Sequence, residues 1–135
     1  MPKPRFINPD TIAKPPGYTQ VVEVTGPGRT VYIAGQLGLD LDGRLVGDPG
    51  DFRAQATQTF ENLKAALAAV GAGFEHIVKI NNYLIDMRHL PILREVRRGY
   101  FGPSDPPAST TVAITALARE GALYEIDAVA VLPEE

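Results

Sequence analysis

The chain has 135 residues, of which 16 are acidic and 13 basic, with a formal net charge of −3 and no cysteine. We expect one domain over residues 1–135 with a single core, in which residues 1–16 form an irregular leader. The acidic balance argues against binding to nucleic acid, and the lack of cysteine excludes disulfides, thiolate catalysis and cysteine-ligated metals. No apolar window approaches the ~20 residues of a membrane span, so we expect a cytoplasmic protein with no membrane partner.

The first predicted elements are two short strands at residues 18–25 and 30–34. The Gly-Pro-Gly turn at residues 26–28 between them is typical of a hairpin. Residues 37–50 contain an Asp-Gly and an Asp-Pro-Gly turn, so any third strand at 37–39 is short and the rest is loop.

A helix follows, because apolar residues recur at spacings of three and four from Phe52 to Val70. Asp51 is positioned to cap its start and Gly71 to end it. One face of this helix therefore packs on an apolar surface.

The segment after this helix alternates as a strand of about nine residues. Its two faces are predicted to carry Val78, Ile80 and Leu84 on one side and Ile77, Tyr83 and Ile85 on the other. Each face is partly apolar and partly polar, so burial on both faces is expected.

A second, more basic helix is predicted at about residues 89–100. Its apolar side consists of Leu90, Leu93, Val96 and Tyr100. Arg97 and Arg98 are most simply interpreted as part of its solvated face.

Two prolines, Pro106 and Pro107, then stop any helix and start extended chain, and strands are predicted at residues 109–115 and 123–132. The order of elements indicates an α+β fold, with a sheet that has both helices on one side.

The last strand places Glu125 and Asp127 on one face, together with Leu123, Val129 and Val131. Neighbouring carboxylates in a desolvated site tend to have one raised pKa, as a general acid or a water-activating base requires. The alternative is that each carboxylate pairs with an arginine or faces water.

Other chemistry has weaker support. His76 and His89 lack the spacing of a zinc motif, so no metal site is predicted, and Ser109 has no G-x-S-x-G context for a nucleophile. Gly35, at the end of a predicted strand, indicates a place where the backbone comes close to a neighbouring group. A bound ligand, tight packing or a β-bulge would each explain a glycine at this position.

Four stretches in order, "VYIAGQLGLD", "QATQTFENLKAALAAVGAGFEHIVKINNYLIDM", "PPASTTVAI" and "YEIDAVAV", resemble the Rid family (RidA/YjgF, reactive intermediate deaminases). The likeness covers about residues 18–132. It implies a chorismate-mutase-like fold, a homotrimer whose sheets form a central barrel, small-molecule clefts between subunits and no cofactor. Deaminases of this family hydrolyse enamines or imines such as 2-aminoacrylate to a 2-keto acid and ammonia.

The resemblance also implies the site. Asp127 matches the late carboxylate that positions or activates water, and Tyr18, Gly35 and Tyr83 match cleft residues, while Thr111 falls where many relatives have cysteine.

Two cleft positions depart from the family pattern. The arginine that holds the substrate carboxylate is replaced by Ser109, which has neither its charge nor its two-pronged geometry. Arg94 stands where relatives carry a cleft asparagine, and it either enters the cleft or extends into solvent.

Two functions remain. One is a cofactor-independent Rid-like hydrolase with weak or absent 2-aminoacrylate deaminase activity, and the other is a non-catalytic protein that binds a small metabolite. Nucleic-acid cleavage, a third activity attached to the family by name, is disfavoured by the acidic composition.

Overall fold

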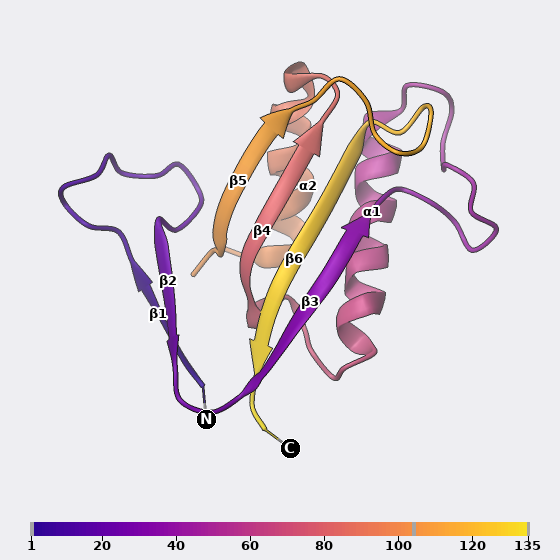
Figure 1. Ribbon diagram of the computed structural model, residues 1–135. Coiled ribbons are helices and arrows are strands. Elements are labelled where there is room, and N and C mark those ends of the chain that lie inside the picture. The colour runs from indigo at the N-terminus through magenta and orange to yellow at the C-terminus, as the bar shows by residue number, and fades with distance from the viewer. Residues whose placement is uncertain (1, 104, 135) are drawn as a thin grey trace.

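The computed structural model describes residues 2–103 and 105–134. Its main sheet has four strands in the order β3 (Arg29–Gln36), β6 (Tyr124–Leu132), β4 (Ile77–Leu84) and β5 (Ala108–Ala113). β4 and β5 are parallel, whereas β6 runs antiparallel to both of its neighbours. The helices α1 (Phe52–Ala68) and α2 (Leu90–Phe101) both cover one face of this sheet (Figure 1), which confirms the predicted α+β fold.

The predicted caps of α1 are present. The Asp51 side chain accepts a hydrogen bond of 3.0 Å from the backbone N–H of Ala54, and Gly71 adopts a φ of +74° just beyond the helix. The residues of α1 that face the sheet are almost fully buried, namely Phe52, Ala56, Phe60, Leu63 and Leu67. This apolar stripe fixes the helix on the sheet.

α2 packs beside α1 through aromatic rings. The Phe60 and Tyr100 rings are stacked with centroids 5.0 Å apart, and Leu93 of α2 is fully buried. Short 3-10 turns precede β4 and α2, at Phe74–His76 and Met87–His89. The arrangement leaves one side of α2 facing the start of β5, where the candidate site lies.

The predicted alternation of β4 is wrong at its first two residues. Ile77 is buried on the helix side with Ile80 and Leu84, while Val78 faces the other way and borders a cavity beside the N-terminal strands. The pairing with β6 shifts register between Ile77 and Lys79, and such a bulge exchanges the faces of the residues before it.

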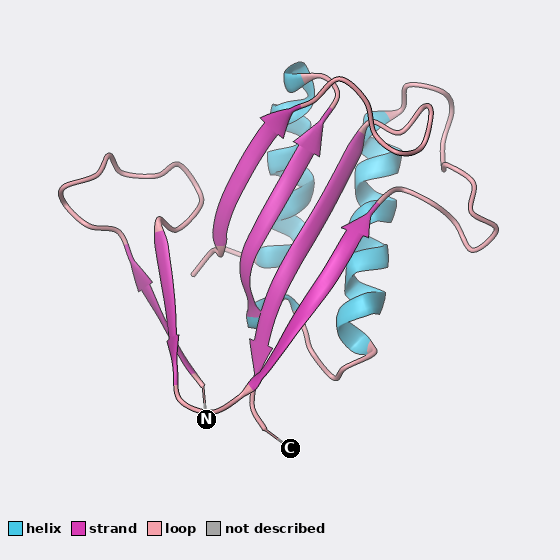
Figure 2. Cartoon of the chain, in the orientation of Figure 1, coloured by secondary structure: helices cyan, strands magenta, loops and turns pink. Residues whose placement is uncertain are grey.

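The N-terminal prediction is also wrong in two respects. The supposed irregular leader contains a strand, β1 (Lys3–Ile7), and β2 (Val21–Thr25) pairs with β1 and not with β3. In Figure 2 this pair of strands stands apart from the main sheet. The turn at residues 26–28 reverses the chain, but turn composition does not determine the partner, and β3 pairs with β6 because its Ile33 is buried against the core.

Candidate functional site

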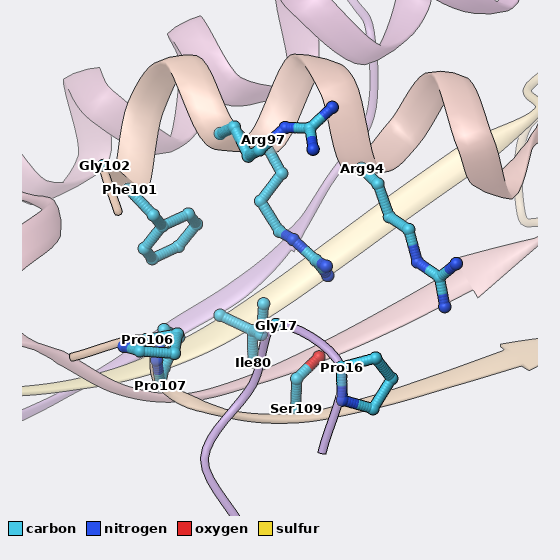
Figure 3. A pocket seen from close by; sticks show the side chains of 11 residues that line it. Pro16, Gly17, Ile80, Arg94, Arg97, Phe101, Gly102, Pro106, Pro107 and Ser109 are labelled. Carbon is cyan, nitrogen blue, oxygen red and sulfur yellow. The ribbon is translucent and has the colours of Figure 1, made fainter. Parts of the chain in front are cut away.

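A cavity of about 280 Å³ lies between α2 and the start of β5. Its apolar walls come from Ile80 of β4, Phe101 at the end of α2, and the proline pair before β5, while Pro16 and Gly17 close another side. Its polar groups come from opposite sides, the arginines from α2 and Ser109 from β5 (Figure 3). Four segments that are distant in sequence thus form one site.

Thr19 attaches the N-terminal segment to this site. It is almost fully buried, its hydroxyl donates a hydrogen bond to the carbonyl of Pro106, and its backbone N–H donates to the carbonyl of Pro107 at 3.2 Å. A proline has no backbone N–H but keeps its carbonyl as an acceptor, and the carbonyls of Pro106 and Pro107 both accept from Thr19. Tyr18, a predicted ligand residue, is therefore held between the cavity-lining Gly17 and the buried Thr19, and it is partly buried itself.

Two arginines of α2 reach from the helix toward β5. Figure 3 shows both extending from the helix toward the strands, Arg97 in the direction of Ile80 and Ser109 and Arg94 to one side of them, and both line the cavity. Arg94 lines this cavity and is also exposed, so both alternatives for it describe part of its surroundings. Of the two arginines predicted on the solvated face, Arg98 is exposed, whereas Arg97 is half-buried and burial lowers its pKa.

Ser109 belongs to a buried hydrogen-bond network that sequence reasoning missed. Asn82 is fully buried, and its side-chain amide donates to the Ser109 hydroxyl at 3.1 Å and to the Thr111 hydroxyl at 3.3 Å. Its carbonyl oxygen accepts a 2.7 Å bond from the hydroxyl of Tyr124, which is also fully buried. Because the Ser109 oxygen accepts from Asn82, its own proton remains available to a ligand in the cavity.

Asp127 lies on the opposite, helix-free face of the sheet. One of its oxygens accepts a 2.8 Å bond from the side-chain amide of Asn81, and the other accepts a 3.0 Å bond from the hydroxyl of Tyr83. The hydrogen bond to Asp127 raises the pKa of Tyr83, and burial raises it further by a smaller amount. Both hydrogen-bond partners of Asp127 are therefore neutral, and neither is the arginine that was considered as an alternative to a catalytic role.

Glu125 shares this open face with Asp127, as predicted from the alternation of β6. Burial raises the pKa of Glu125, and the negative charge of Asp127 adds a smaller effect in the same direction. The predicted raised pKa in the carboxylate pair is present, and its main cause is burial.

Gly35 sits at a bulge in β3, where the pairing with β6 shifts between Ile33 and Gln36. A Cβ atom at Gly35 would lie 2.3 Å from a carboxylate oxygen of Glu125, so the close approach is made to this chain's own side chain. The tight packing and the bulge that were alternatives to a ligand are both present. Gly35 also borders a second, more open hollow of about 590 Å³ beside α1.

Within one chain, the predicted residues thus form two groups. Arg94 and Ser109 line the cavity, whereas the other five do not. Of these five, Thr111 shares the Asn82 amide with Ser109, and Tyr18 follows the lining residue Gly17 in the chain. The residues that the sequence reasoning missed are Arg97 and Asn82. Arg97 could have been found from its position three residues after Arg94 on the same helix face, and Asn82 from its place between Ile80 and Leu84 on the buried face of a strand.

Among residues 2–103 and 105–134, none of the helices is long and apolar enough to cross a membrane. The same residues contain no cluster of three or more histidine, aspartate or glutamate side chains arranged to hold a metal ion.

Comparison with known proteins places this geometry in context. The family model described as Endoribonuclease L-PSP matches residues 10–132. Protein DfrA of Myxococcus xanthus is 41% identical over 84% of this chain and 84% of that protein. A 2-iminobutanoate/2-iminopropanoate deaminase of Mus musculus is 40% identical over 84% of this chain and 80% of that protein.

Among solved structures, the Yersinia pestis protein YyfB, described as a protein of unknown function of the conserved Rid family, superposes with a TM-score of 0.84. It is 34% identical, and the match covers 96% of this chain and 98% of that one.

Proposed function

Because this chain belongs to the Rid family, we propose that it binds a small anionic imine or enamine in the cavity beside α2 and hydrolyses it without a cofactor. The observation that carries the proposal is the joint presence of Arg94 and Ser109 in one cavity. In family deaminases the arginine stands on the strand, at the position of Ser109. Here a guanidinium enters from the helix instead, so the site keeps a positive charge but in a different place.

This displacement determines which substrates are expected. A serine hydroxyl at the strand position provides no charge and no two-pronged grip on a carboxylate. A substrate as small as 2-aminoacrylate would have to leave the strand wall to reach Arg94, and would then lie away from the groups on the strand. We therefore expect weak 2-aminoacrylate deaminase activity and a better substrate whose anionic group extends further toward α2.

Hydrolysis at this site requires more than one copy of the chain. Asp127, the proposed water-activating carboxylate, lies on the helix-free sheet face, whereas Arg94 and Ser109 lie on the helix side. A homotrimer in which the open face of one subunit meets the cavity of the next would bring both groups to one cleft. The open face suits such an assembly because it exposes large apolar side chains, including Tyr32 at 80% and Val112 at 38% of their surface.

The test is the release of ammonia and keto acid from freshly generated 2-aminoacrylate. We expect slow turnover by the wild type and a gain of about ten- to a hundredfold in Ser109→Arg, from the charge-assisted bonds it restores. Ser109→Lys is the matched control, because it restores the charge without the planar fork, and it should gain less. Fast turnover by the wild type would contradict the inferred effect of Ser109.

The carboxylate and the assembly are tested in the same preparation. Asp127→Asn in the Ser109→Arg background should abolish the gained turnover, because the amide cannot accept a proton from water. Unchanged turnover would remove Asp127 from the mechanism. In solution we expect three times the chain mass of 14.5 kDa, and a monomer would contradict the shared cleft.

A second candidate is a non-catalytic ligand-binding protein. The observation that favours it is that no carboxylate of the described residues lines the cavity of a single chain. It predicts ligand binding that persists in Asp127→Asn and no turnover of any imine. A nucleic-acid substrate, which the name of the matching family model suggests for other members, is not part of the proposal, because the net charge of −3 disfavours binding to a phosphate backbone.

A further inference from the structure

We propose that the cavity beside α2 selects small dianions over monoanions, with Arg97 as the residue that determines this preference. The inference rests on the proposed function in that it concerns the same ligand site, and it adds the charge of the ligand.

Three arginines line the cavity, and all come from α2, namely Arg94, Arg97 and Arg98. No acidic side chain in the described part of the chain lines it with them. The one acidic residue of α2, Glu95, is paired with Arg53 of α1 at 3.0 Å and is thus engaged elsewhere. The cavity therefore concentrates positive charge without an internal counterion.

Burial makes the charge of Arg97 expensive, because this residue is half-buried, whereas Arg94 and Arg98 line the cavity from exposed positions. Arg94 lies three residues before Arg97 on the same helix face, so two like charges border one small space. Buried charges are normally paired. A monoanion neutralises one of these guanidiniums, whereas a ligand with two negative charges neutralises both, and a guanidinium fork suits either a carboxylate or a phosphate group.

The remaining walls fit the rest of such a ligand. The Ser109 proton is free because the Ser109 oxygen already accepts from Asn82, so the hydroxyl can donate to an anionic oxygen. Ile80 and Phe101 provide apolar contact for a short carbon chain between the charged ends. The volume of about 280 Å³ is close to the lower end of the ~300–1,000 Å³ range of small-molecule sites.

Two sources supply this chemistry, a dicarboxylate and a phosphate monoester. Both offer two negative charges near neutral pH, and the arms of the experiment distinguish them. Calorimetric titration of the full-length protein would use succinate and its monoanionic counterpart butanoate, which have the same number of carbons. Inorganic phosphate at pH 8, where it is mainly a dianion, forms the third arm.

For the wild type we expect succinate or phosphate to bind about ten- to a hundredfold more tightly than butanoate, the gain from one additional charge-assisted contact. Arg97→Gln should remove most of this preference while leaving the weak binding of butanoate, because Arg94 remains. Arg119→Gln removes the same charge from an exposed turn and is the matched control. It should leave the preference unchanged, and far-UV circular dichroism would establish that each variant is folded.

Equal binding of succinate, phosphate and butanoate by the wild type would overturn the dianion inference and leave the proposed hydrolase intact. A preference that persists in Arg97→Gln would overturn the role of Arg97. Absence of binding of all three anions would overturn the inference as well, whereas the hydrolase proposal is judged separately by the 2-aminoacrylate assay with Ser109→Arg.

Discussion

The hydrogen bond between Tyr124 and Asn82 offers a direct test of the buried network behind the cavity. Both side chains are fully buried, and the 2.7 Å bond from the Tyr124 hydroxyl engages the Asn82 carbonyl oxygen. Tyr124→Phe removes only the hydroxyl and leaves this oxygen buried without its donor. The cost of such an unsatisfied group is about 1–3 kcal/mol, so we expect the free energy of unfolding to fall by that amount.

The measurement is urea unfolding of wild type and variant at the same protein concentration, because any self-association couples stability to concentration. Tyr100→Phe is the matched control, since this hydroxyl donates at 2.7 Å to the exposed carboxylate of Glu61 and its loss leaves no buried group unsatisfied. It should lower the free energy of unfolding by less than Tyr124→Phe does.

The same substitution should affect the cavity. The Asn82 amide donates to the Ser109 hydroxyl at 3.1 Å, and the bond from Tyr124 fixes the orientation of the Asn82 side chain. Binding of succinate should therefore weaken severalfold in Tyr124→Phe but not in Tyr100→Phe, because Tyr100 does not line the cavity. A loss of stability below about 0.5 kcal/mol, within the range of ordinary surface substitutions, would refute the view that this bond satisfies an otherwise orphaned group.

Two further predictions concern the open face of the sheet. The pKa of Glu125 is raised above 4.5 in the folded protein, so the folded state holds the Glu125 proton more tightly than the unfolded state does. The stability that comes from this proton is therefore lost as the pH rises from 4.5 through the folded pKa. Unfolding measured between about pH 4 and pH 7 should therefore show a growing stability advantage of Glu125→Gln over wild type, and a constant difference would contradict this. Gly35→Ala should lower the free energy of unfolding by about 1 kcal/mol, because the added Cβ displaces the Glu125 carboxylate. This cost should disappear in a Glu125→Ala background. An equal cost in both backgrounds would show that the bulge itself, and not Glu125, requires glycine.

Local signals in the sequence were sufficient for the elements that make up the core. The spacing of Phe52, Phe60 and Leu67 and the cap at Asp51 gave the first helix, and strict alternation gave the faces of the last strand. These signals are local because helix and strand periods are properties of neighbouring residues. What they do not contain is the partner of each strand, and for this reason the hairpin between residues 18–25 and 30–34 was wrong.

The site shows the same division. Ser109 and Arg94 were identified by their alignment with family positions, but whether they meet depends on how α2 lies over β5, which no local pattern encodes. Arg97 was assigned to solvent because surface arginines usually are. The structure overturns this because residues 16–19, held to the proline pair by Thr19, cover the space next to the helix.

The change from a strand arginine to helix arginines alters more than the position of a charge. A guanidinium anchored on a strand at the cleft wall holds a carboxylate close to the sheet, whereas Arg94 and Arg97 reach across the cavity from the far side. The anionic end of a ligand then lies at α2 and its other end at Ser109, so ligand length and charge are selected together. Restoring the strand arginine in Ser109→Arg should thus favour short monoanions, because a carboxylate can then be held at the strand wall without reaching the guanidiniums of α2.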